Sequence, residues 1–529
     1  MTETYDAIII GAGHNGLVTA TYLAKTGLNV LILERRHELG GAAATEQIFP
    51  GYYVNTGAPD TGLFRHKIIR DLKLEKFGLR FIQSDAAVFA PIPGDRGLSL
   101  WRDVGKSVVE IGRFSKRDAS KYPEFLSYMN SLTTVLGEIL ERTPPDFSDL
   151  ALGELWPWLN IGLNLRRSGK REMMEFFRIL PLPIRDFLDE WFDSEELKGV
   201  LALPAISGGM PGPFAAGTTL MFIYHQLGGP NGGYRSSRFI LGGQGRLADT
   251  LLTVAESYGA TIRRGIGVGR VWLDDEQVRG VVLEDGEAIP SRIVVSSLDP
   301  RRTFFDLVGG ANLMPQFMRS IKNIRFRGTT AKINLALSGL PAFYSEDDDT
   351  HLKGYIAISP NLEYLERAWD DAKYGRISSK PILETRIPTL LAPQMAPDNR
   401  HIMSITVQYA PYDLKVGDWD ARREELGDLV ISTLAQHAPD LPELVLHRQV
   451  ITPLDWEQEY GLTEGSIYHG QMEMDQLFFM RPVPGYARYR TPFENLYLCG
   501  AGTHPGGGVT GAPGFNAARE ILRDWRKGS

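Results

Sequence analysis

The sequence predicts an α/β fold that combines a dinucleotide-binding domain made of separate segments with an inserted helical region and a second domain built on a β-sheet. Three observations lead to this prediction. A strand–helix–strand pattern with a Gly-rich loop opens the chain, a strand with a long glycine loop and a helix closes it, and further strand patterns lie between. The length of 529 residues suffices for two or three domains.

The opening pattern contains every part of a βαβ unit. The apolar run from Ile8 to Ile10 is typical of a buried parallel strand. Glycines spaced as G-x-G-x-x-G follow, and apolar residues then recur at helical spacing as far as Gly27. A second apolar strand, residues 30–33, ends in an acidic residue. The glycines are Gly11, Gly13 and Gly16, and the acidic residue is Glu34.

Each part of this unit has a physical role in binding a dinucleotide. Gly11 permits a tight turn, Gly13 lets a pyrophosphate approach the backbone, and Gly16 lets the helix pack closely on the strand. The helix N-terminus offers free N–H groups and partial positive charge to the diphosphate. Glu34 lies where a carboxylate binds ribose hydroxyls, and it would repel a 2′-phosphate. The nucleotide half is therefore expected to be plain adenosine.

Composition excludes several classes of function. The net charge of −7 argues against a nucleic-acid-binding face as the main function. Cys499 is the single cysteine, so neither an intrachain disulfide nor a redox dithiol can form, which excludes the flavin disulfide reductases. The single cysteine favours a reducing, cytoplasmic compartment. No apolar run of about 18 residues is present and no room precedes the first strand for a signal peptide, so neither a spanning helix nor a presequence is expected.

The remaining elements follow in order along the chain. Residues 108–140 and 173–201 read as amphipathic helices, and residues 246–258 as a further helix after a glycine turn, 242–245. That turn lacks a βαβ unit of its own, so no second dinucleotide site for NAD(P)H is expected. The expected strands are residues 261–263, 268–273, 278–283, 293–296, 327–338, 401–409, 445–451 and 496–499.

Six motifs carry a resemblance to a known family. They are GAGHNGL (11–17), ERRHELGGAA (34–43), LGGQGRLADTL (241–251), VVSSLDP (294–300), IYHGQMEMDQLFFMRPVPGY (467–486) and LYLCGAGTHPGGGVTGAPGFNAA (496–518). The chain resembles the phytoene desaturase-like FAD oxidoreductases over essentially its full length. Within them it is similar to the pyridine nucleotide-disulphide oxidoreductase domain-containing protein 2 group.

The resemblance implies a discontinuous Rossmann-like FAD-binding domain of the glutathione reductase/amine oxidase type. We expect this domain to comprise residues 1–90, 235–300 and 490–529. An inserted helical cap would occupy residues 91–234, and a mixed-sheet substrate domain residues 301–489.

The same resemblance implies which residues hold FAD. The Gly-rich loop with its His14 and Asn15 would bind the ADP half together with Glu34. Ala42 occupies a position where many relatives have an arginine. The negative charge of the diphosphate would therefore be neutralised by the backbone, by Arg35 or by Arg36. A helix N-terminus beside the flavin pyrimidine would stabilise negative charge there. The other implied FAD-binding residues are Gly40, Gly41, Val268, Gly500, Ala501, Gly502, His504, Val509, Thr510 and Gly511.

Lys332 and His469 are the candidate catalytic residues. Similar flavin amine oxidases have a lysine on a comparable strand that approaches flavin N5 through water; an outward-facing Lys332 is the alternative. His469 is a candidate acid, base or hydrogen-bond donor, and the alternative is a packed or capping histidine. No H-x-H, C-x-x-C or H-E-x-x-H pattern is present, so no metal site is expected.

The leading hypothesis is an FAD-dependent oxidoreductase that takes a hydride from a C–H bond of an apolar substrate. The electrons would pass to O2, a quinone or another acceptor. Three alternatives remain open: a flavin amine or alicyclic oxidase, a flavin-dependent double-bond isomerase or saturase, and an FAD-holding interaction protein with little turnover.

One segment raises the question of membrane contact. Residues 152–170 combine Trp156, Trp158 and other apolar residues with a basic cluster that contains Arg166 and Arg167. Such a patch can lie at a membrane interface, where it would help to load a lipid-soluble substrate. The alternative is an amphipathic helix that closes the substrate domain.

Overall fold

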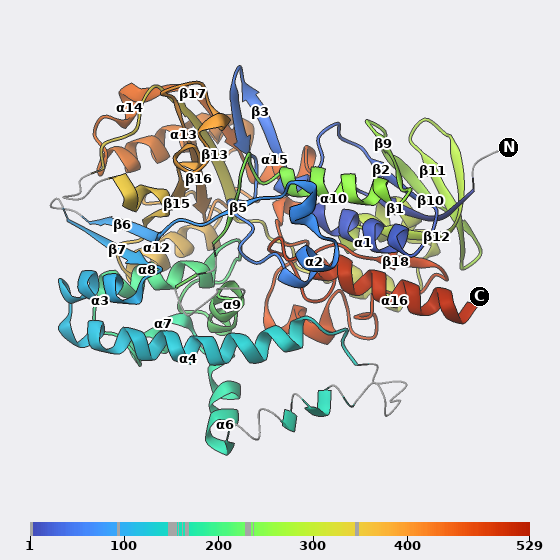
Figure 1. Ribbon diagram of the computed structural model, residues 1–529, viewed down its shortest axis with the longest axis horizontal. Coiled ribbons are helices and arrows are strands. Elements are labelled where there is room, and N and C mark those ends of the chain that lie inside the picture. The colour runs from blue at the N-terminus through green and yellow to red at the C-terminus, as the bar shows by residue number, and fades with distance from the viewer. Residues whose placement is uncertain are drawn as a thin grey trace.

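The computed structural model describes residues 4–92, 96–145, 156, 158–160, 162–163, 169–227, 234–235, 237–343 and 349–528. Within these ranges the chain forms two seven-stranded sheets and two short two-stranded ones, with helices packed around them (Figure 1). The predicted α/β fold with a discontinuous Rossmann-like sheet, a helical region and a second sheet is confirmed.

The first sheet, at the right of Figure 1, collects its strands from three distant parts of the chain. Its strand order is β10-β11-β12-β1-β2-β9, with β18 paired to β12. Strands β1, β2, β9, β12 and β18 run parallel, whereas β10–β11–β12 is an antiparallel ribbon. The strands are β1 (Tyr5–Ile10), β2 (Val30–Glu34), β9 (Thr261–Arg264), β10 (Val268–Asp274), β11 (Gln277–Leu283), β12 (Ala288–Ser296) and β18 (Leu496–Leu498).

Both faces of this sheet are covered, which explains the uninterrupted apolar sequence of β1. Ile9 packs with the side of the sheet that holds three helices, α1 (His14–Lys25), α10 (Arg246–Ser257) and α16 (Ala512–Gly528). Its neighbours Ile8 and Ile10 face the opposite cluster, which includes Phe304 and Phe317. These two lie on the π-helix Arg302–Gly309 and on α11 (Pro315–Lys322).

The second sheet has the strand order β17-β13-β16-β15-β14-β6-β7. One face packs against α13 (Trp419–Ala435) through residues such as Ile333 and Ile405. The opposite face carries the intervening polar residues. The strands are β6 (Ala86–Ile92), β7 (Arg96–Trp101), β13 (Thr330–Leu337), β14 (Tyr355–Ile358), β15 (Ile382–Arg386), β16 (His401–Gln408) and β17 (Val445–Ile451).

One predicted boundary is wrong. The sequence analysis ended the first nucleotide segment at residue 90 and began the helical region at residue 91, but both residues lie in β6 of the second sheet. β6 pairs with β7 and, in parallel, with β14, so residues 86–101 close one edge of that sheet. The parallel partner of β6 is 267 residues away (Val88 pairs with Tyr355), and local sequence patterns cannot indicate such a pairing.

The helical region is more divided than its hydrophobic periodicity suggested. The helix expected at 108–140 is split near Phe114, because the Ser115 side chain accepts a hydrogen bond from Asp118 N and caps a new helix. The helix expected at 173–201 is interrupted by Pro181, Pro183 and the Ser194 cap. The helices are α3 (Val104–Gly112), α4 (Lys116–Leu140), α6 (Lys170–Ile179), α7 (Ile184–Asp189), α8 (Glu195–Ile206) and α9 (Thr218–His225).

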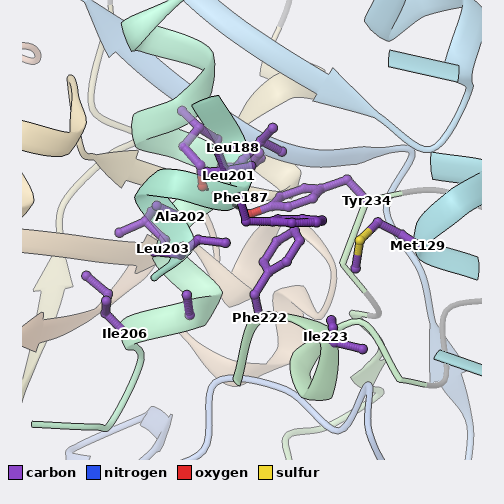
Figure 2. Close-up of a cluster of buried hydrophobic side chains, with 14 of the residues drawn as sticks. Met129, Phe187, Leu188, Leu201, Ala202, Leu203, Ile206, Phe222, Ile223 and Tyr234 are labelled. Carbon is purple, nitrogen blue, oxygen red and sulfur yellow. Dashed lines mark hydrogen bonds between the residues drawn. The ribbon is translucent and has the colours of Figure 1, made fainter. Parts of the chain in front are cut away.

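A hydrophobic core joins these helices to one another (Figure 2). Phe187, Phe222 and Tyr234 lie at its centre, beside Leu201 of α8. Figure 1 shows α4 spanning the base of the molecule, with α6 projecting from it. The remaining elements are α2 (His66–Asp71), α12 (Leu362–Lys373), α14 (Leu441–Leu444), α15 (Pro453–Gln458), and the strand pairs β3–β4 (Thr45–Phe49, Tyr52–Asn55) and β5–β8 (Phe81–Ile82, Phe239–Ile240).

Candidate active site

A cavity of about 510 Å³ is lined by residues of both sheets. From the first sheet it receives the Gly-rich loop after β1 and the carboxyl end of β2. From the second sheet it receives Lys332, Glu384 and Thr406. The carboxyl ends of parallel strands are where open α/β sheets bind ligands, so this cavity is the candidate site.

Most of the predicted site residues line this cavity, and five do not. Those that line it are Gly11, Gly13, His14, Asn15, Gly16, Glu34, Arg35, Arg36, Gly40, Gly41, Val268, Lys332, His469, Ala501 and Val509. Gly500, Gly502, His504, Thr510 and Gly511 are not among its lining residues.

The five residues outside the cavity lining are buried, and the loop that carries them contributes Ala501 and Val509 to the cavity. A Cβ on Gly500 would lie 2.3 Å from Ser297 O, and one on Gly502 would lie 2.4 Å from Pro300 Cδ. These glycines therefore permit the final loop to pack against the loop that follows β12. The His504 side chain is completely buried, and its backbone oxygen accepts a hydrogen bond from Tyr489 Oη at 2.8 Å.

The glycines of the opening loop have the distinct roles that their spacing predicts. Gly11 has φ +93°, and a Cβ there would lie 2.4 Å from Ser297 Oγ. A Cβ on Gly16 would lie 2.2 Å from Gly11 O, so α1 could not approach β1. A Cβ on Gly13 would meet nothing within 4 Å, because Gly13 faces the open cavity. A close ligand can therefore reach the backbone at Gly13.

Several buried polar atoms of this region have no hydrogen-bond partner in the described protein. They are His14 Nε2, Asn15 Oδ1, Arg36 Nη1 and His469 Nδ1, all on residues that line the cavity. The N-terminus of α1 also has no side-chain cap. Buried polar groups in proteins nearly always have a hydrogen-bond partner, so these unpaired atoms fit the binding of a polar ligand such as a dinucleotide.

The acidic residue at the end of β2 organises the turn around it. Glu34 accepts hydrogen bonds from Ala12 N at 2.7 Å and from Arg36 N at 3.0 Å. The Arg36 guanidinium forms an ion pair with Glu46 at 2.9 Å, and Arg35 donates to Glu459 O at 3.0 Å. Both arginines thus have protein partners, but Arg36 Nη1 has none, so the α1 N-terminus and Arg36 both remain able to bind an anion such as a diphosphate.

Lys332 faces the cavity, so the outward-facing alternative is wrong. Its side chain is 1% exposed and its ammonium donates to Thr406 Oγ1 at 3.2 Å. Polar and apolar side chains do alternate between the two faces of β13, but neither face is exposed to solvent. Ile333 packs in the core, and Lys332 lines the cavity. Burial lowers the pKa of Lys332 to about 7.

His469 lies close to the Gly-rich loop. It has φ +57°, and it is partly exposed although its Nδ1 atom is buried. Burial, then the charges of Arg481 and Arg302, lower the pKa of His469 to about 3. Burial and the neighbouring His469 lower the pKa of His14 to about 4. Both rings are therefore neutral at physiological pH, each with one N–H donor and one acceptor.

The loop that carries His469 is held by the buried guanidinium of Arg481. Its relative exposure is 2%, and no carboxylate among the described residues forms an ion pair with it. It donates instead to backbone carbonyl oxygens of two loops, the one around His469 and the one around Ala501. These belong to Tyr468, Gly470, Gln471, Gln476 and Ala501.

The buried histidines predict how stability depends on pH. Burial is the main cause that lowers the pKa of four of them, so below about pH 6.5 the unfolded chain binds more protons than the folded one. Stability is then complete above about pH 6.5 and falls toward about pH 4, by up to about 1.4 kcal/mol per pH unit for each histidine. They are His14, His225 and His504, with pKa values of about 4, and His469, with a value of about 3.

Urea unfolding of the FAD-saturated protein at several pH values between about 5 and 8 measures this slope. His225 serves as the variant because it hydrogen-bonds Pro204 O at 2.6 Å, which a glutamine can still do. His225→Gln is expected to make the slope shallower. An unchanged slope in this variant would contradict the assignment.

The second sheet also carries, on its cavity side, a group of charged and polar side chains that was not predicted from the sequence. The members of this group that line the cavity are Asp60, Arg235, Tyr355 and Glu384. Arg386 is not among the lining residues, but its guanidinium contacts Asp60. The segment Ile-Leu-Glu-Thr-Arg at 382–386 places Glu384 and Arg386 on one face of β15, but it does not alternate between apolar and polar residues and so gives no clear strand signal. The partners of that face come from distant loops and could not be read from the chain.

Comparison with known proteins decides the family. The sequence profile described as "Flavin containing amine oxidoreductase" matches residues 16–522. The chain belongs to this family. It is an FAD-dependent oxidoreductase, and FAD is the cofactor that the Gly-rich loop and the orphaned polar atoms fit.

Curated relatives of this flavoprotein include a mammalian and two microbial proteins. Pyridine nucleotide-disulfide oxidoreductase domain-containing protein 2 of Rattus norvegicus is 37% identical, covering 98% of this chain and 94% of the relative. A limonene dehydrogenase polypeptide of Castellaniella defragrans is 27% identical over 98% and 94%. Phytoene desaturase of Fusarium fujikuroi is 26% identical over 98% and 89%. The resemblance inferred from the motifs is confirmed.

Solved structures confirm the fold. An oxidoreductase from Methanosarcina mazei superposes with a TM-score of 0.61 at 14% identity, covering 98% of this chain and 100% of that one. Cyclohexylamine oxidase from Brevibacterium oxydans gives a TM-score of 0.59 at 14% identity, with 99% of both chains covered.

Proposed function

We propose that this flavoprotein removes a hydride from a C–H bond of a substrate with a large apolar part, as in a desaturation or dehydrogenation. The observation that carries the proposal is the single cavity shared by the dinucleotide loop and the second sheet. Apolar side chains such as Leu63, Leu462 and Ile467 line it too, and they suit a hydrocarbon chain. Relatives named limonene dehydrogenase and phytoene desaturase support this class of chemistry.

When bound, FAD would supply two-electron acceptor chemistry at N5, with O2, a quinone or another compound as the final acceptor. The protein's own residues bind and orient. The α1 N-terminus and Gly13 would receive the diphosphate, and Glu34 the ribose hydroxyls. Val509, at the entrance to α16, and Ala501 would lie along the flavin end.

The two candidate catalytic residues are proposed to act differently. His469 stays neutral and lies beside His14, so we assign it hydrogen bonding to the cofactor rather than proton transfer. Lys332 lies on the wall formed by the second sheet, so we assign it contact with the substrate.

A second candidate is oxidation of an amine or alicyclic compound. The specific observation in its favour is the buried Lys332 on β13, in a chain that belongs to the flavin-containing amine oxidoreductase family. A cationic amine bound near Lys332 would favour the neutral form of this side chain, whose pKa burial already lowers to about 7.

Anaerobic bleaching of the bound flavin tests both candidates. The FAD-saturated protein is mixed without oxygen with polyenes, cyclic terpenes, alkyl acids, amines and cyclic ketones, and the flavin absorbance is followed. We expect bleaching by at least one compound that is oxidised at a C–H bond. Bleaching by amines alone would establish the second candidate and reject the first.

We also propose that the protein acts in the cytoplasm and contacts a membrane peripherally through the segment around Trp156. No helix in the described ranges is long and apolar enough to cross a membrane. Trp156 is 61% exposed and Leu159 is 53% exposed, while Arg166 and Arg167 lie outside the described residues. Co-sedimentation with anionic liposomes tests the contact, and absence of binding with or without anionic lipid would reject it.

A further inference from the structure

A buried histidine and a buried tyrosine contact each other in the cavity wall. His225, the last residue of α9, and Tyr468 both line the cavity, and Tyr468 Oη lies 3.2 Å from His225 Nε2. At one end of this pair, His225 Nδ1 lies 2.6 Å from Pro204 O. At the other end, Tyr468 Oη lies 3.0 Å from Ser207 O. The four groups therefore form one chain of three hydrogen-bond contacts.

This chain has room for one proton more than the two neutral side chains supply. A carbonyl oxygen can only accept, so the contact with Pro204 O requires a hydrogen on His225 Nδ1. The Nε2 atom of the neutral ring then has no hydrogen and can also only accept. The single hydroxyl hydrogen of Tyr468 is left between two acceptors, His225 Nε2 and Ser207 O. It can serve only one of them, so one contact lacks a hydrogen.

One added proton would complete the chain. With a hydrogen on both ring nitrogens, His225 donates to Pro204 O and to Tyr468 Oη. The Tyr468 hydroxyl then donates to Ser207 O, and each of the three contacts contains a hydrogen. The geometry is therefore that of a site that can take up a proton without any movement of the side chains.

The two carbonyl groups come from the C-terminal end of α8, where a positive charge is favoured. Pro204 lies in the last turn of this helix, and Ser207 is its C-cap. The last carbonyl groups of a helix carry partial negative charge, which stabilises a nearby cation. Burial, and then the charge of Arg235, nevertheless lower the pKa of His225 to about 4. The pair is thus neutral in the resting protein and free to accept a proton.

The pair lies beside the loop that leads to the expected flavin end of the cavity. A Cβ on Gly507 would lie 2.3 Å from Tyr468 Cδ1, so the backbone of this loop packs on the tyrosine ring. Tyr224, the neighbour of His225 on α9, donates to Gly507 O at 2.7 Å. Val509, two residues further on, lines the cavity. The pair is therefore next to the part of the cavity where the proposed oxidation takes place.

The proposed desaturation requires a proton acceptor, because it removes two hydrogens from neighbouring carbons. One leaves as a hydride with two electrons, for which the flavin is the acceptor. The other leaves as a proton, and the electron pair of its C–H bond becomes the second bond of the new C=C group. The protein must supply a group that takes this proton.

The two carboxylates that act electrostatically on His225 already have partners that a proton would displace. Glu384 forms an ion pair with Arg235. Asp60 accepts a hydrogen bond from Tyr355 Oη, and it lies 3.5 Å from the Arg386 guanidinium. A proton on either carboxylate would break such a contact, whereas a proton on the histidine–tyrosine pair completes one.

We propose that Tyr468 and His225 together accept the proton of the desaturation, an inference that rests on the proposed function. The substrate proton goes to Tyr468 Oη, and Tyr468 passes its own hydroxyl proton to His225 Nε2. Tyr468 ends neutral, and His225 carries the positive charge while its Nδ1–H still donates to Pro204 O. The proton returns to water once the product has left the cavity.

Nuclear magnetic resonance of the FAD-loaded protein with ¹⁵N-labelled histidine tests the proton arrangement without turnover. The missing signal in His225→Gln identifies His225. We expect a hydrogen on Nδ1 and none on Nε2 at about pH 7. Tyr468→Phe is expected to shift the Nε2 resonance, since it removes the partner of this atom. A hydrogen on Nε2 in the wild type, or an unchanged Nε2 resonance in Tyr468→Phe, would overturn the inference.

Anaerobic bleaching of the flavin tests the proton transfer itself. The probe is whichever compound of the panel above bleaches the wild-type flavin fastest, with phytoene as its polyene and limonene as its cyclic terpene. Tyr468→Phe keeps the ring that packs on Gly507, and His225→Gln keeps a donor for Pro204 O. Each is expected to slow bleaching by about a hundredfold, with little change in the probe concentration that gives half the maximal rate.

The double variant and a matched control separate this role from a structural one. Because the two residues act as one acceptor, Tyr468→Phe/His225→Gln is expected to bleach about as fast as either single variant. Tyr409→Phe is the control: Tyr409 is also buried and donates to Pro211 O at 2.7 Å, but it is not among the lining residues. It is expected to bleach at the wild-type rate. Multiplied losses in the double variant, or an equal loss in Tyr409→Phe, would reject the proposal.

Failure of this inference and failure of the proposed function give different results. If no compound bleaches the wild-type flavin, the proposed function is rejected, and the proton acceptor with it. If the wild type and both single variants bleach equally fast, the proton acceptor alone is rejected and the oxidoreductase function stands.

Discussion

Replacing Gly13 by alanine is expected to lower FAD affinity by roughly tenfold to a hundredfold, equal to about 1.4–2.8 kcal/mol, with little change in the stability of the apoprotein. The backbone at Gly13 has φ −65° and ψ 161°, which any residue adopts. A Cβ there meets no protein atom within 4 Å and points into the cavity. The new methyl group therefore occupies space that the diphosphate needs, and it disturbs no contact within the protein.

Gly16→Ala provides the contrast. Its Cβ would lie 2.2 Å from Gly11 O, so the substitution must move α1 away from β1 whether or not FAD is present. We expect it to lower both the free energy of unfolding and the FAD affinity. Urea unfolding of the two apoproteins, with fluorescence titration of FAD, separates the effects. A Gly13→Ala variant that binds FAD like the wild type would place the diphosphate elsewhere.

Replacing Arg481 by methionine is expected to destabilise the protein by more than about 3 kcal/mol. The side chain is buried, and its loss would leave several backbone carbonyls without a donor. The loop with His469 and the loop with Ala501 would lose their common partner, so FAD affinity should fall as well. Urea unfolding and FAD titration measure the two losses.

Arg481→Lys separates charge from geometry. A lysine keeps the positive charge, but its single ammonium cannot reach carbonyls on several sides as the planar guanidinium does. We expect less than half of the lost stability to return. Full recovery in the lysine variant would mean that Arg481 acts through its charge alone.

Much of the cofactor region could be predicted from the sequence because its signals are local. The spacing of Gly11, Gly13 and Gly16 encodes a turn, an open approach and a close packing contact, and the structure has all three. Glu34 and Val268 also line the cavity as predicted. These features depend on residues near one another in the chain, where pattern and geometry coincide.

The substrate wall could not be predicted in the same way. Lys332 was recognised as a polar residue in an apolar strand, but its environment depends on Thr406 and Glu384, which reach it through strand pairing. Asp60 and Arg235 arrive from loops far away in sequence. The strands β6 and β7 were assigned to the wrong domains for the same reason, because the sequence of one strand does not show which strand it pairs with.

The first sheet also constrains when the protein can acquire its cofactor. β1 aligns with β12, with Ala7 opposite Ile293, and Thr19 of α1 donates to Gly514 O at 3.1 Å. β1 is therefore synthesised long before its pairing partner β12. The hydrogen bond from α1 to Gly514 can form only after residue 514 has left the ribosome. We therefore expect stable flavin loading to require that the segment around Gly514 has been synthesised and has packed on α1.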